Sequence, residues 1–167
     1  CSNLTSPPDM SNTINVTNMY STFYRCSKLI EAPIIPPNVT DMSSTFYECF
    51  NLTSPPDMSN AINVTSMPYT FKGCENLTSA PVIPSNVTSM SQTFRDCSKL
   101  TGDVIIQSNR IYSMSLCFAY TNGLLPKSVY MPYTGYNATH NTYLAASNAS
   151  IDGKYGVTVM DINTYVG

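Results

Sequence analysis

Charge is the scarcest property of this sequence. Acidic and basic residues together make up 11% of the chain, against about 25% in an ordinary soluble domain. The eight Lys and Arg residues are scattered, and the formal net charge is only −2. Such a chain creates no field that would attract nucleic acid or anionic lipid. We therefore expect no nucleic-acid partner, and Ser, Thr and Asn fill most polar positions instead.

The segments and motifs that mark membrane proteins or enzymes are also missing. No apolar run approaches the roughly 20 residues that span a bilayer, so no membrane insertion is expected in this segment. His140 is the only histidine, and its nearest acid in sequence is Asp152. The carboxylates occur singly, and no Gly-rich phosphate loop, G-x-S-x-G or C-x-x-C pair is present. We expect no catalytic residue, cofactor or metal, and interpret His140 as a helix-start or surface residue.

Internal repetition is what the sequence has instead. The six cysteines lie at positions 1, 26, 49, 74, 97 and 117. Residues 1–25 match residues 49–73 at 18 of 25 positions, and residues 26–48 match residues 74–96 at 13 of 23. The repeating unit is therefore a pair of turns of 25 and 23 residues. Turns of this length stabilise one another by stacking, since one turn alone cannot bury its apolar face.

Each turn reads M-x-x-T-F-x-x-C-x-x-L, then a Pro-rich stretch, then N-V-T-x-M. Apolar residues that recur once per turn form continuous columns when the turns stack, which predicts a buried core ladder. Its members are Phe23, Phe46, Phe71, Phe94, Cys26, Cys49, Cys74, Cys97, Leu29, Leu52, Leu77 and Leu100.

Proline restricts the secondary structure that these turns can form. It has no N–H to donate to a ladder, so we expect strands of two to four residues, at Ile34–Ile35, Val82–Ile83 and Val104–Ile106. A second short extended piece is expected at each N-V-T-x-M run. Ser and Thr caps predict single helical turns over residues 42–49 and 90–97.

The F-x-x-C-x-x-L pattern, followed by a strand ending in I-P and then N-V-T, resembles the BspA-like class of leucine-rich repeats. The resemblance covers residues 1 to about 125 and implies a curved solenoid with a parallel sheet on one face. It also implies a role in adhesion or host contact on the surface of a bacterium, a protozoan or a phage. The sequence departs from the class in its A-P-V-I-P strand region and in the proline pairs at 7–8 and 55–56.

The repeat decays after Cys97. The last turn is interpreted as 20 residues long, with Arg110 at the Met position, Met114 at the Phe position and Tyr120 at the Leu position. The sequence thus predicts a leucine-rich-repeat-like superhelix over residues 1–123 and a small α+β cap over 124–167. Within the cap we expect strands at 128–133 and 156–162 and a helix at 140–148.

The N-terminal end offers two interpretations. Cys1 falls on the repeat position of Cys26, so we favour further repeats upstream, although a mature lipoprotein also begins at a cysteine. For the cysteines themselves, one column predicts buried free thiols, with one or more disulfides as the alternative.

Nine N-x-[ST] sequons occur in the chain, at Asn3, Asn15, Asn38, Asn51, Asn63, Asn76, Asn86, Asn137 and Asn148. They predict a glycosylated surface if the chain is secreted by a eukaryote. The alternative, which we favour for a bacterial or phage source, is that Asn serves a turn and Thr the outer face of a strand.

The sequence thus predicts a non-catalytic, extracellular or cell-surface recognition and adhesion module. Its partner would be a protein or glycan on a host or neighbouring cell. The alternative is a structural fibre, spike or spacer that self-associates through solenoid ends, including a phage-borne one on the virion surface. The tyrosines beside the core Phe suit either binding or covering of the convex side. Binding is expected on the strand face, and the candidate ligand-binding residues recur once per turn just after the Leu, at Thr5, Glu31, Thr53, Thr78 and Thr101.

Overall fold

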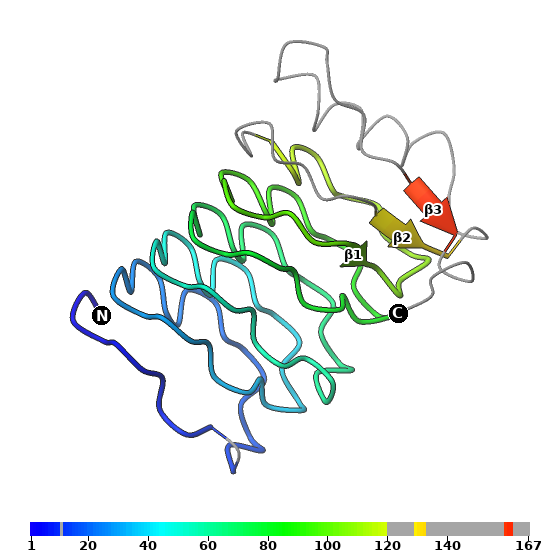
Figure 1. Cartoon of the computed structure of the whole chain (residues 1–167). Helices are drawn as coiled ribbons and strands as arrows, with labels where there is room; N and C mark the ends of the chain where they lie inside the picture. The colour runs from blue at the N-terminus through cyan, green and yellow to red at the C-terminus, as the bar shows by residue number, and fades with distance from the viewer. Residues whose placement is uncertain (11, 120–128, 133–158, 162–167) are drawn as a thin grey trace.

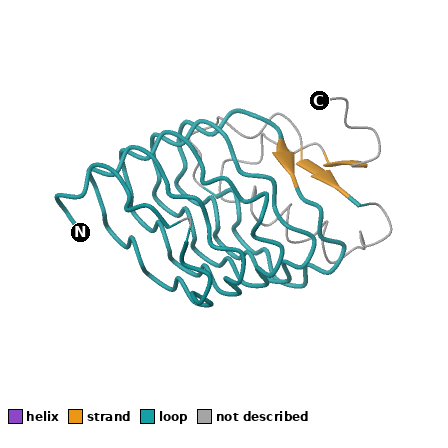
Figure 2. Cartoon of the chain, turned by 90° about the horizontal axis from the view of Figure 1, so that it is seen from below, coloured by secondary structure: helices purple, strands orange, loops and turns teal. Residues whose placement is uncertain are grey.

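A computed structural model describes residues 1–10, 12–119, 129–132 and 159–161. The chain winds through successive turns that lie side by side, with the N-terminal turn at one end (Figure 1). Seen along another direction, the turns form a row of similar loops (Figure 2). Three strands follow at the other end, β1 (Val104–Ile105), β2 (Val129–Met131) and β3 (Val159–Asp161). They form one parallel sheet in the order β1-β2-β3.

The earlier turns meet along the Pro-rich side through single contacts instead of named strands. At the expected strand Val82–Ile83 there is one parallel bridge, between Ile83 and Ile106. At Ile34–Ile35 there is one hydrogen bond, from the Ile35 amide to the Asp57 carbonyl at 3.4 Å. Since the prolines of each Pro-rich stretch have no amide donor, a longer ladder cannot form there.

The N-V-T-x-M runs supply a second line of contacts between turns. An isolated parallel bridge joins each run to the next, where the sequence suggested a short extended piece. The residues that pair in this line are Asn18, Asp41, Ser66, Ser89 and Ser113.

The segments M-x-x-T-F-x-x-C, which we call the arch segments, cover residues 19–26, 42–49, 67–74 and 90–97. The helical turns expected at 42–49 and 90–97 are wrong, because no arch segment is helical. Left-handed residues interrupt each segment: Ser44 has a φ of 56° and Glu48 a φ of 53°. An L-residue incurs a steric penalty in this region of backbone space, so something outside the segment must hold it there.

Hydrogen bonds between turns hold the arch segments in this conformation. The amide of Ser44 donates to the Pro68 carbonyl of the next turn at 2.9 Å, and the amide of Glu48 donates to Lys72 at 2.7 Å. The Phe46 amide between them also leaves the segment and donates to Thr70 at 2.9 Å, whereas the Tyr47 amide donates locally, to Ser44 at 3.2 Å. Because alternate amides leave the segment, the i→i−4 ladder of an α-helix cannot form.

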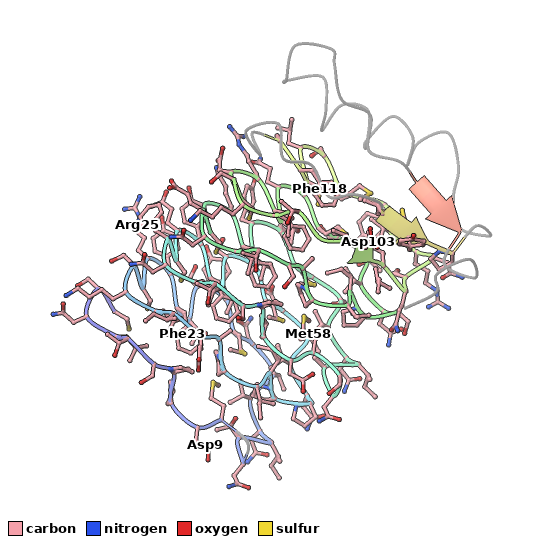
Figure 3. The ribbon with its side chains drawn as sticks, in the orientation of Figure 1. Asp9, Phe23, Arg25, Met58, Asp103 and Phe118 are labelled. Atoms are coloured by element: carbon pink, nitrogen blue, oxygen red, sulfur yellow. The ribbon has the colours of Figure 1, made fainter. Side chains whose placement is uncertain are left out.

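The apolar core runs along the whole stack. The Phe side chains form a column of parallel rings whose centroids lie 5.4 Å apart between Phe23 and Phe46 and 5.7 Å apart between Phe94 and Phe118. Figure 3 labels Phe23 and Phe118, the first and last rings of this column. The Leu and Met columns lie beside it and are buried, with members Leu29, Leu52, Leu77, Leu100, Met19, Met42, Met67, Met90 and Met114.

The structure corrects the register that the sequence suggested after Cys97. Met114 continues the Met column, not the Phe column, and Phe118 stacks on Phe94. The amide of Phe94 donates to the carbonyl of Cys117, as the amide of Phe71 donates to Thr93. Cys117 therefore occupies the buried Thr position of the arch. Using it as the Cys marker shifted the alignment and misplaced Arg110 and Tyr120, the latter lying outside the described residues.

The parallel sheet crosses the domain boundary expected between residues 123 and 124. Val104 pairs with Val129, and Val129 pairs with Val159. β2 lies within the strand expected at 128–133 and β3 within that at 156–162. The helix expected at 140–148 lies outside the described residues.

Candidate functional site

The row of residues expected to bind a ligand lies on the surface. Thr5, Thr53, Thr78 and Thr101 are exposed, as is Glu31. Backbone hydrogen bonds link the row, from Thr53 to Ile30 at 3.0 Å and from Thr78 to Thr53 at 3.3 Å. Ile30, not Glu31, therefore occupies this position in the second turn. The expected row is one residue out of register there, because Ile30 directly follows the Leu.

Hydroxyl groups of this row are already used within the protein. Thr53 Oγ1 donates to the Ile30 carbonyl at 3.2 Å, and Thr78 Oγ1 donates to the Thr53 carbonyl at the same distance. A hydroxyl has one proton to give. The row is thus a seam that ties each turn to the previous one.

The cysteine column lies inside the stack and holds free thiols. Cys26, Cys49, Cys74 and Cys97 are fully buried, whereas Cys1 is exposed. The thiols of Cys49, Cys74 and Cys97 each donate to a Phe carbonyl of the preceding turn at 3.1 Å. Burial raises the pKa of Cys49 to about 12 and the pKa of Cys74 well above its ordinary value. These thiols are therefore protonated at neutral pH, and a protonated thiol is a poor nucleophile.

The sequon asparagines of the repeats act as ties between turns. Asn38 Nδ2 donates to the Ile14 carbonyl at 2.8 Å, and Asn86 Nδ2 donates to Ile62 at 2.8 Å. Asn51, Asn63 and Asn76 also donate to a carbonyl of the preceding turn. The amide nitrogen that a glycan would modify is therefore engaged at these five positions, which favours the structural interpretation of the sequons.

Aromatic and charged side chains gather on the outer edge of the arch segments. The rings of Tyr24 and Tyr47 stack with centroids 4.9 Å apart. The Arg25 guanidinium lies 5.2 Å from the Tyr24 ring centroid and its Nε donates to Glu48 at 2.7 Å. Lys72 Nζ lies 5.4 Å from the Tyr47 ring centroid. These side chains interact with one another, and the stacked faces of the two tyrosine rings are covered. A partner could therefore contact mainly the rims of the rings.

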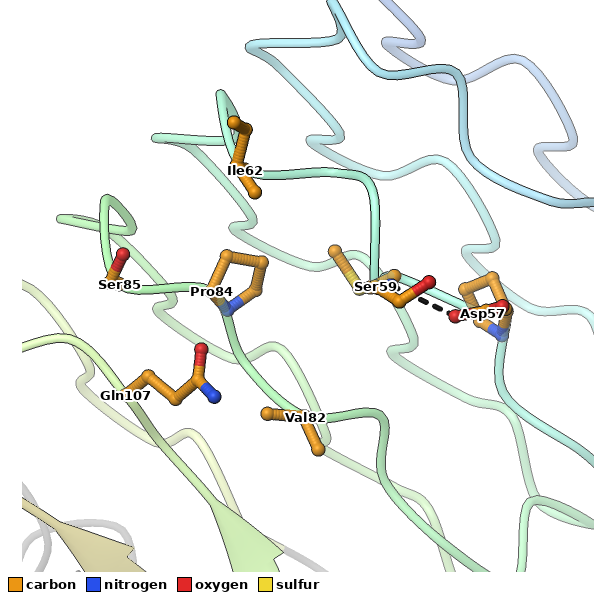
Figure 4. Close-up of a pocket in the computed structure, with 9 residues that line it drawn as sticks. Asp57, Ser59, Ile62, Val82, Pro84, Ser85 and Gln107 are labelled. Carbon is orange, nitrogen blue, oxygen red and sulfur yellow. Dashed lines mark hydrogen bonds between the residues drawn. The ribbon is translucent and has the colours of Figure 1, made fainter.

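The Pro-rich side is hollowed by two grooves, which the sequence did not predict. One has a volume of about 430 Å³ and is lined by Pro56, Asp57, Met58, Ser59, Ile62, Val82, Pro84, Ser85 and Gln107 (Figure 4). The other has a volume of about 610 Å³ and is lined by Met10, Ile34, Ile35, Pro36, Pro37, Asn38, Ser59, Asn60, Ile62 and Asn63. We call this surface the groove face.

Large aliphatic side chains stand exposed on the groove face. Ile62 is 62% exposed, Ile34 is 51% exposed and Val82 is 44% exposed. Asp57 lies near them and accepts a hydrogen bond from the Ser59 amide at 2.9 Å, which lowers the pKa of its carboxyl. The surface is thus apolar with one ionised carboxylate. A single exposed Ile is ordinary on a protein, but several beside grooves mark an interaction surface.

Metal-binding and membrane-spanning features are not found where the structure can be read. No group of three or more His, Cys, Asp or Glu side chains comes together in residues 1–10, 12–119, 129–132 and 159–161. The same residues contain no long apolar helix that could cross a membrane. His140 and Asp152 lie outside them.

Comparison with known protein families identifies a match over much of the chain. Residues 17–125 match the family described as "Mycoplasma protein of unknown function, DUF285". No curated protein and no solved structure matches the chain significantly.

Proposed function

The chain belongs to the DUF285 family, and we propose that it is a non-catalytic recognition or adhesion module that presents the groove face to a partner outside the cell. The observation that carries this proposal is the exposed aliphatic row beside the two grooves, formed by Ile34, Ile62 and Val82. Apolar surface of this kind is stabilised when a partner removes it from water. A protein on a host or neighbouring cell fits such a surface better than a glycan, which needs more polar groups.

The fold that we propose is a solenoid of the BspA-like leucine-rich-repeat class. Three features support it: the once-per-turn Phe, Cys and Leu columns, the hydrogen bonds that join consecutive turns, and the parallel sheet at the C-terminal end. Stacked turns of this type build an extended surface in which one feature recurs at a regular spacing.

A non-catalytic role is supported by the state of the nucleophilic side chains. The buried thiols stay protonated at neutral pH because burial disfavours the thiolate. The Thr hydroxyls inside the arches are also engaged: Thr45 Oγ1 lies 2.9 Å from the Met19 carbonyl and 2.7 Å from that of Met42. These groups hold turns together instead of facing a substrate.

Attachment of coated beads to cultured animal cells tests the proposal. Beads that carry the folded chain should attach saturably, and protease treatment of the cells should abolish attachment while glycosidase treatment should not. Ile62→Asn should weaken attachment. Tyr20→Ser is the matched control, because Tyr20 is 64% exposed but belongs to an arch segment and lines neither groove.

Three results would overturn this assignment. Attachment no greater than that of albumin-coated beads would exclude a recognition role for cells of this kind. Attachment abolished by Tyr20→Ser but kept with Ile62→Asn would place recognition on the arch segments. Attachment abolished by glycosidase treatment alone would identify a glycan partner instead of a protein.

A structural role as a fibre, spike or spacer is the second candidate. The observation that favours it is the sameness of the packing from turn to turn: the Phe rings of Phe46, Phe71 and Phe94 repeat at 5.5 Å with nearly parallel planes. Equivalent contacts allow stacks to extend end to end. Light scattering and electron microscopy over a range of concentrations test this, since concentration-dependent rods support it and a constant monomer argues against it.

A further inference from the structure

The two grooves arise from the unequal lengths of consecutive turns. The Ile35 amide donates to the Asp57 carbonyl, and the Thr65 amide donates to the Thr40 carbonyl. In this register Met58, which follows Asp57, is equivalent to Ile35. Five residue steps separate Ile35 from Thr40, whereas seven separate Met58 from Thr65. The two additional residues of the longer turn are therefore located in the corner 58–65.

The following turn returns to the shorter corner. Ile83 and Thr88 are five steps apart, and Thr88 donates its amide to Thr65 at 2.9 Å. The corner 58–65 thus stands between two shorter corners, 35–40 and 83–88, and forms a ridge. One groove lies on each side of it, and Ser59 and Ile62 line both. Figure 4 shows Ile62 on this ridge, facing Pro84 and Val82 across the groove.

The spacing of the two grooves follows from this alternation. Their floors, at residues 34–38 and 82–85, are two turns apart. Adjacent turns lie about 4.8 Å apart where their backbones are hydrogen bonded and 5.4–5.7 Å apart at the Phe rings. The two floors are therefore separated by about 10–11 Å. A polyproline II helix rises about 9.3 Å over three residues, whereas side chains on one face of a β-strand recur every 6.6–6.8 Å. The separation of the grooves is thus closer to the polyproline II period than to the period of a β-strand face.

The negative charge of Asp57, beside the ridge, adds a second requirement for the occupant. Asp57 lines one groove and is exposed beside Ile62. Asp9 occupies the equivalent position two turns earlier, since residues 1–25 and 49–73 share the run L-T-S-P-P-D-M-S-N. In the turns that alternate with these aspartates, the equivalent position is aliphatic: Ile34 lies between Asp9 and Asp57, and Val82 follows Asp57. A basic side chain of the occupant would meet a carboxylate at two-turn intervals.

The geometry points to a polypeptide in the polyproline II conformation as the occupant of the groove face. It lies along the stack axis, places an apolar side chain in each groove and pairs a Lys or Arg with Asp57. This inference rests on the proposed recognition function and names the chemistry of the partner. Polyproline II segments suit such a surface because they lose little conformational entropy on binding.

Binding of synthetic peptides to the full chain tests the inference by fluorescence anisotropy. One peptide repeats Leu-Pro-Pro with a single Arg over about 15 residues, enough for several polyproline II turns. A second alternates Leu with Thr, and a third is a helical peptide with Leu at every seventh position. We expect saturable binding of the first peptide only. Ile62→Asn or Val82→Thr removes apolar surface from the lining of a groove and should weaken this binding about tenfold.

Matched variants distinguish binding at the groove face from nonspecific hydrophobic binding. Ile14 occupies the same repeat position as Ile62 and is 59% exposed, but it lines neither groove. Ile14→Asn should therefore leave the affinity unchanged, while Asp57→Asn should lower it and reduce its dependence on salt. Circular dichroism spectra of all variants should match that of the parent chain.

The outcomes distinguish this inference from the proposed function. Equal binding of the alternating or the helical peptide, or an effect of Ile14→Asn as large as that of Ile62→Asn, overturns the polyproline II assignment. Absence of peptide binding, together with bead attachment that still depends on Ile62, overturns it while leaving the recognition role in place.

Discussion

Truncation of one ring in the Phe column measures how far consecutive turns depend on one another. Phe46 is fully buried and stacks on Phe23 at 5.4 Å and on Phe71 at 5.5 Å. Phe46→Ala removes a buried aromatic side chain and leaves a cavity, which lowers the free energy of unfolding by about 3–5 kcal/mol. The value should fall in the upper part of this range, because both faces of the ring are stacked against a neighbour.

Phe23→Ala is the internal comparison for this prediction. Phe23 has one stacked partner, Phe46, and is 4% exposed. A stacked aromatic pair contributes about 0.5–1.5 kcal/mol beyond the area that it buries. Phe23→Ala should therefore destabilise the chain by less than Phe46→Ala, with a difference of about that size.

Urea denaturation supplies the measurement. The chain contains no tryptophan and twelve tyrosines, so near-ultraviolet circular dichroism of the tyrosines reports tertiary packing. Far-ultraviolet signals should be recorded in parallel, because repeat stacks can unfold in parts. A cost below about 1 kcal/mol for Phe46→Ala would refute the buried column. Equal costs for the two variants would refute the contribution of stacking between turns.

Three further predictions follow from interactions inside the stack. Burial raises the pKa of Cys49 to about 12 from an ordinary value of 9.0, so the folded chain keeps a proton that the unfolded chain loses. The free energy of unfolding should be constant below pH 9 and decrease above it, by at most about 1.4 kcal/mol per pH unit for each such thiol. Urea denaturation at pH 8–11 should show a shallower decrease of this free energy with pH for Cys49→Ala. The same dependence on pH in both proteins would contradict the reasoning. Asn86→Asp replaces an amide donor that lies 2.8 Å from a carbonyl, and should lower the free energy of unfolding by about 0.5–1.5 kcal/mol in urea denaturation. An unchanged free energy of unfolding would show that this hydrogen bond does not contribute to stability. Cys117→Thr should change the urea midpoint little, because Thr occupies that arch position in earlier turns. Cys97→Thr forces an extra methyl group into the filled Cys column and should lower the free energy of unfolding by about 1–3 kcal/mol. A larger loss for Cys117→Thr than for Cys97→Thr would contradict the corrected register.

The interior positions could be predicted from the sequence because each recurs once per turn. Phe71, Cys74 and Leu77 are spaced three residues apart in the sequence, and the equivalent positions one turn away have the same residue types. All three side chains are fully buried in the structure. Periodicity was enough for this inference, since a column of large apolar residues cannot face water at every turn.

The conformation of the arch segments could not be predicted in the same way. The run from Met42 to Cys49 has Ser and Thr near its start and apolar residues at helical spacing, which locally favours a helical turn. The deciding hydrogen bonds lead to residues more than twenty positions away, such as that from Glu48 to Lys72. Local patterns do not contain that information, and tertiary contacts override propensity.

The groove face was missed for a different reason. The 25- and 23-residue alternation was visible in the sequence, but the place of the two additional residues within the turn was not. That place depends on which residues pair between turns, such as Ile35, whose amide donates to the Asp57 carbonyl. The exposed Ile62 and the ionised Asp57 gave no separate signal, because single aliphatic and acidic residues are ordinary on surfaces.

Stacking also explains why charge is so scarce in this chain. Equivalent residues of adjacent turns lie about 4.8 Å apart, and like charges at that distance repel by roughly 1–3 kcal/mol near a protein surface. An Asn or Thr at such a position can instead donate to the preceding turn, as Asn38 and Thr53 do. Opposite charges in adjacent turns attract one another instead, as Arg25 and Glu48 show at 2.7 Å.

The same repulsion accounts for the two-turn period. Asp9 and Asp57 occupy one position in alternate turns, and the aliphatic Ile34 separates them. A strictly one-turn repeat with this Asp would place a carboxylate above a carboxylate along the whole surface. Doubling the period keeps the carboxylates about 9.6 Å apart, near the Debye length at physiological salt. A two-turn unit therefore allows a carboxylate beside the groove face without placing like charges in adjacent turns.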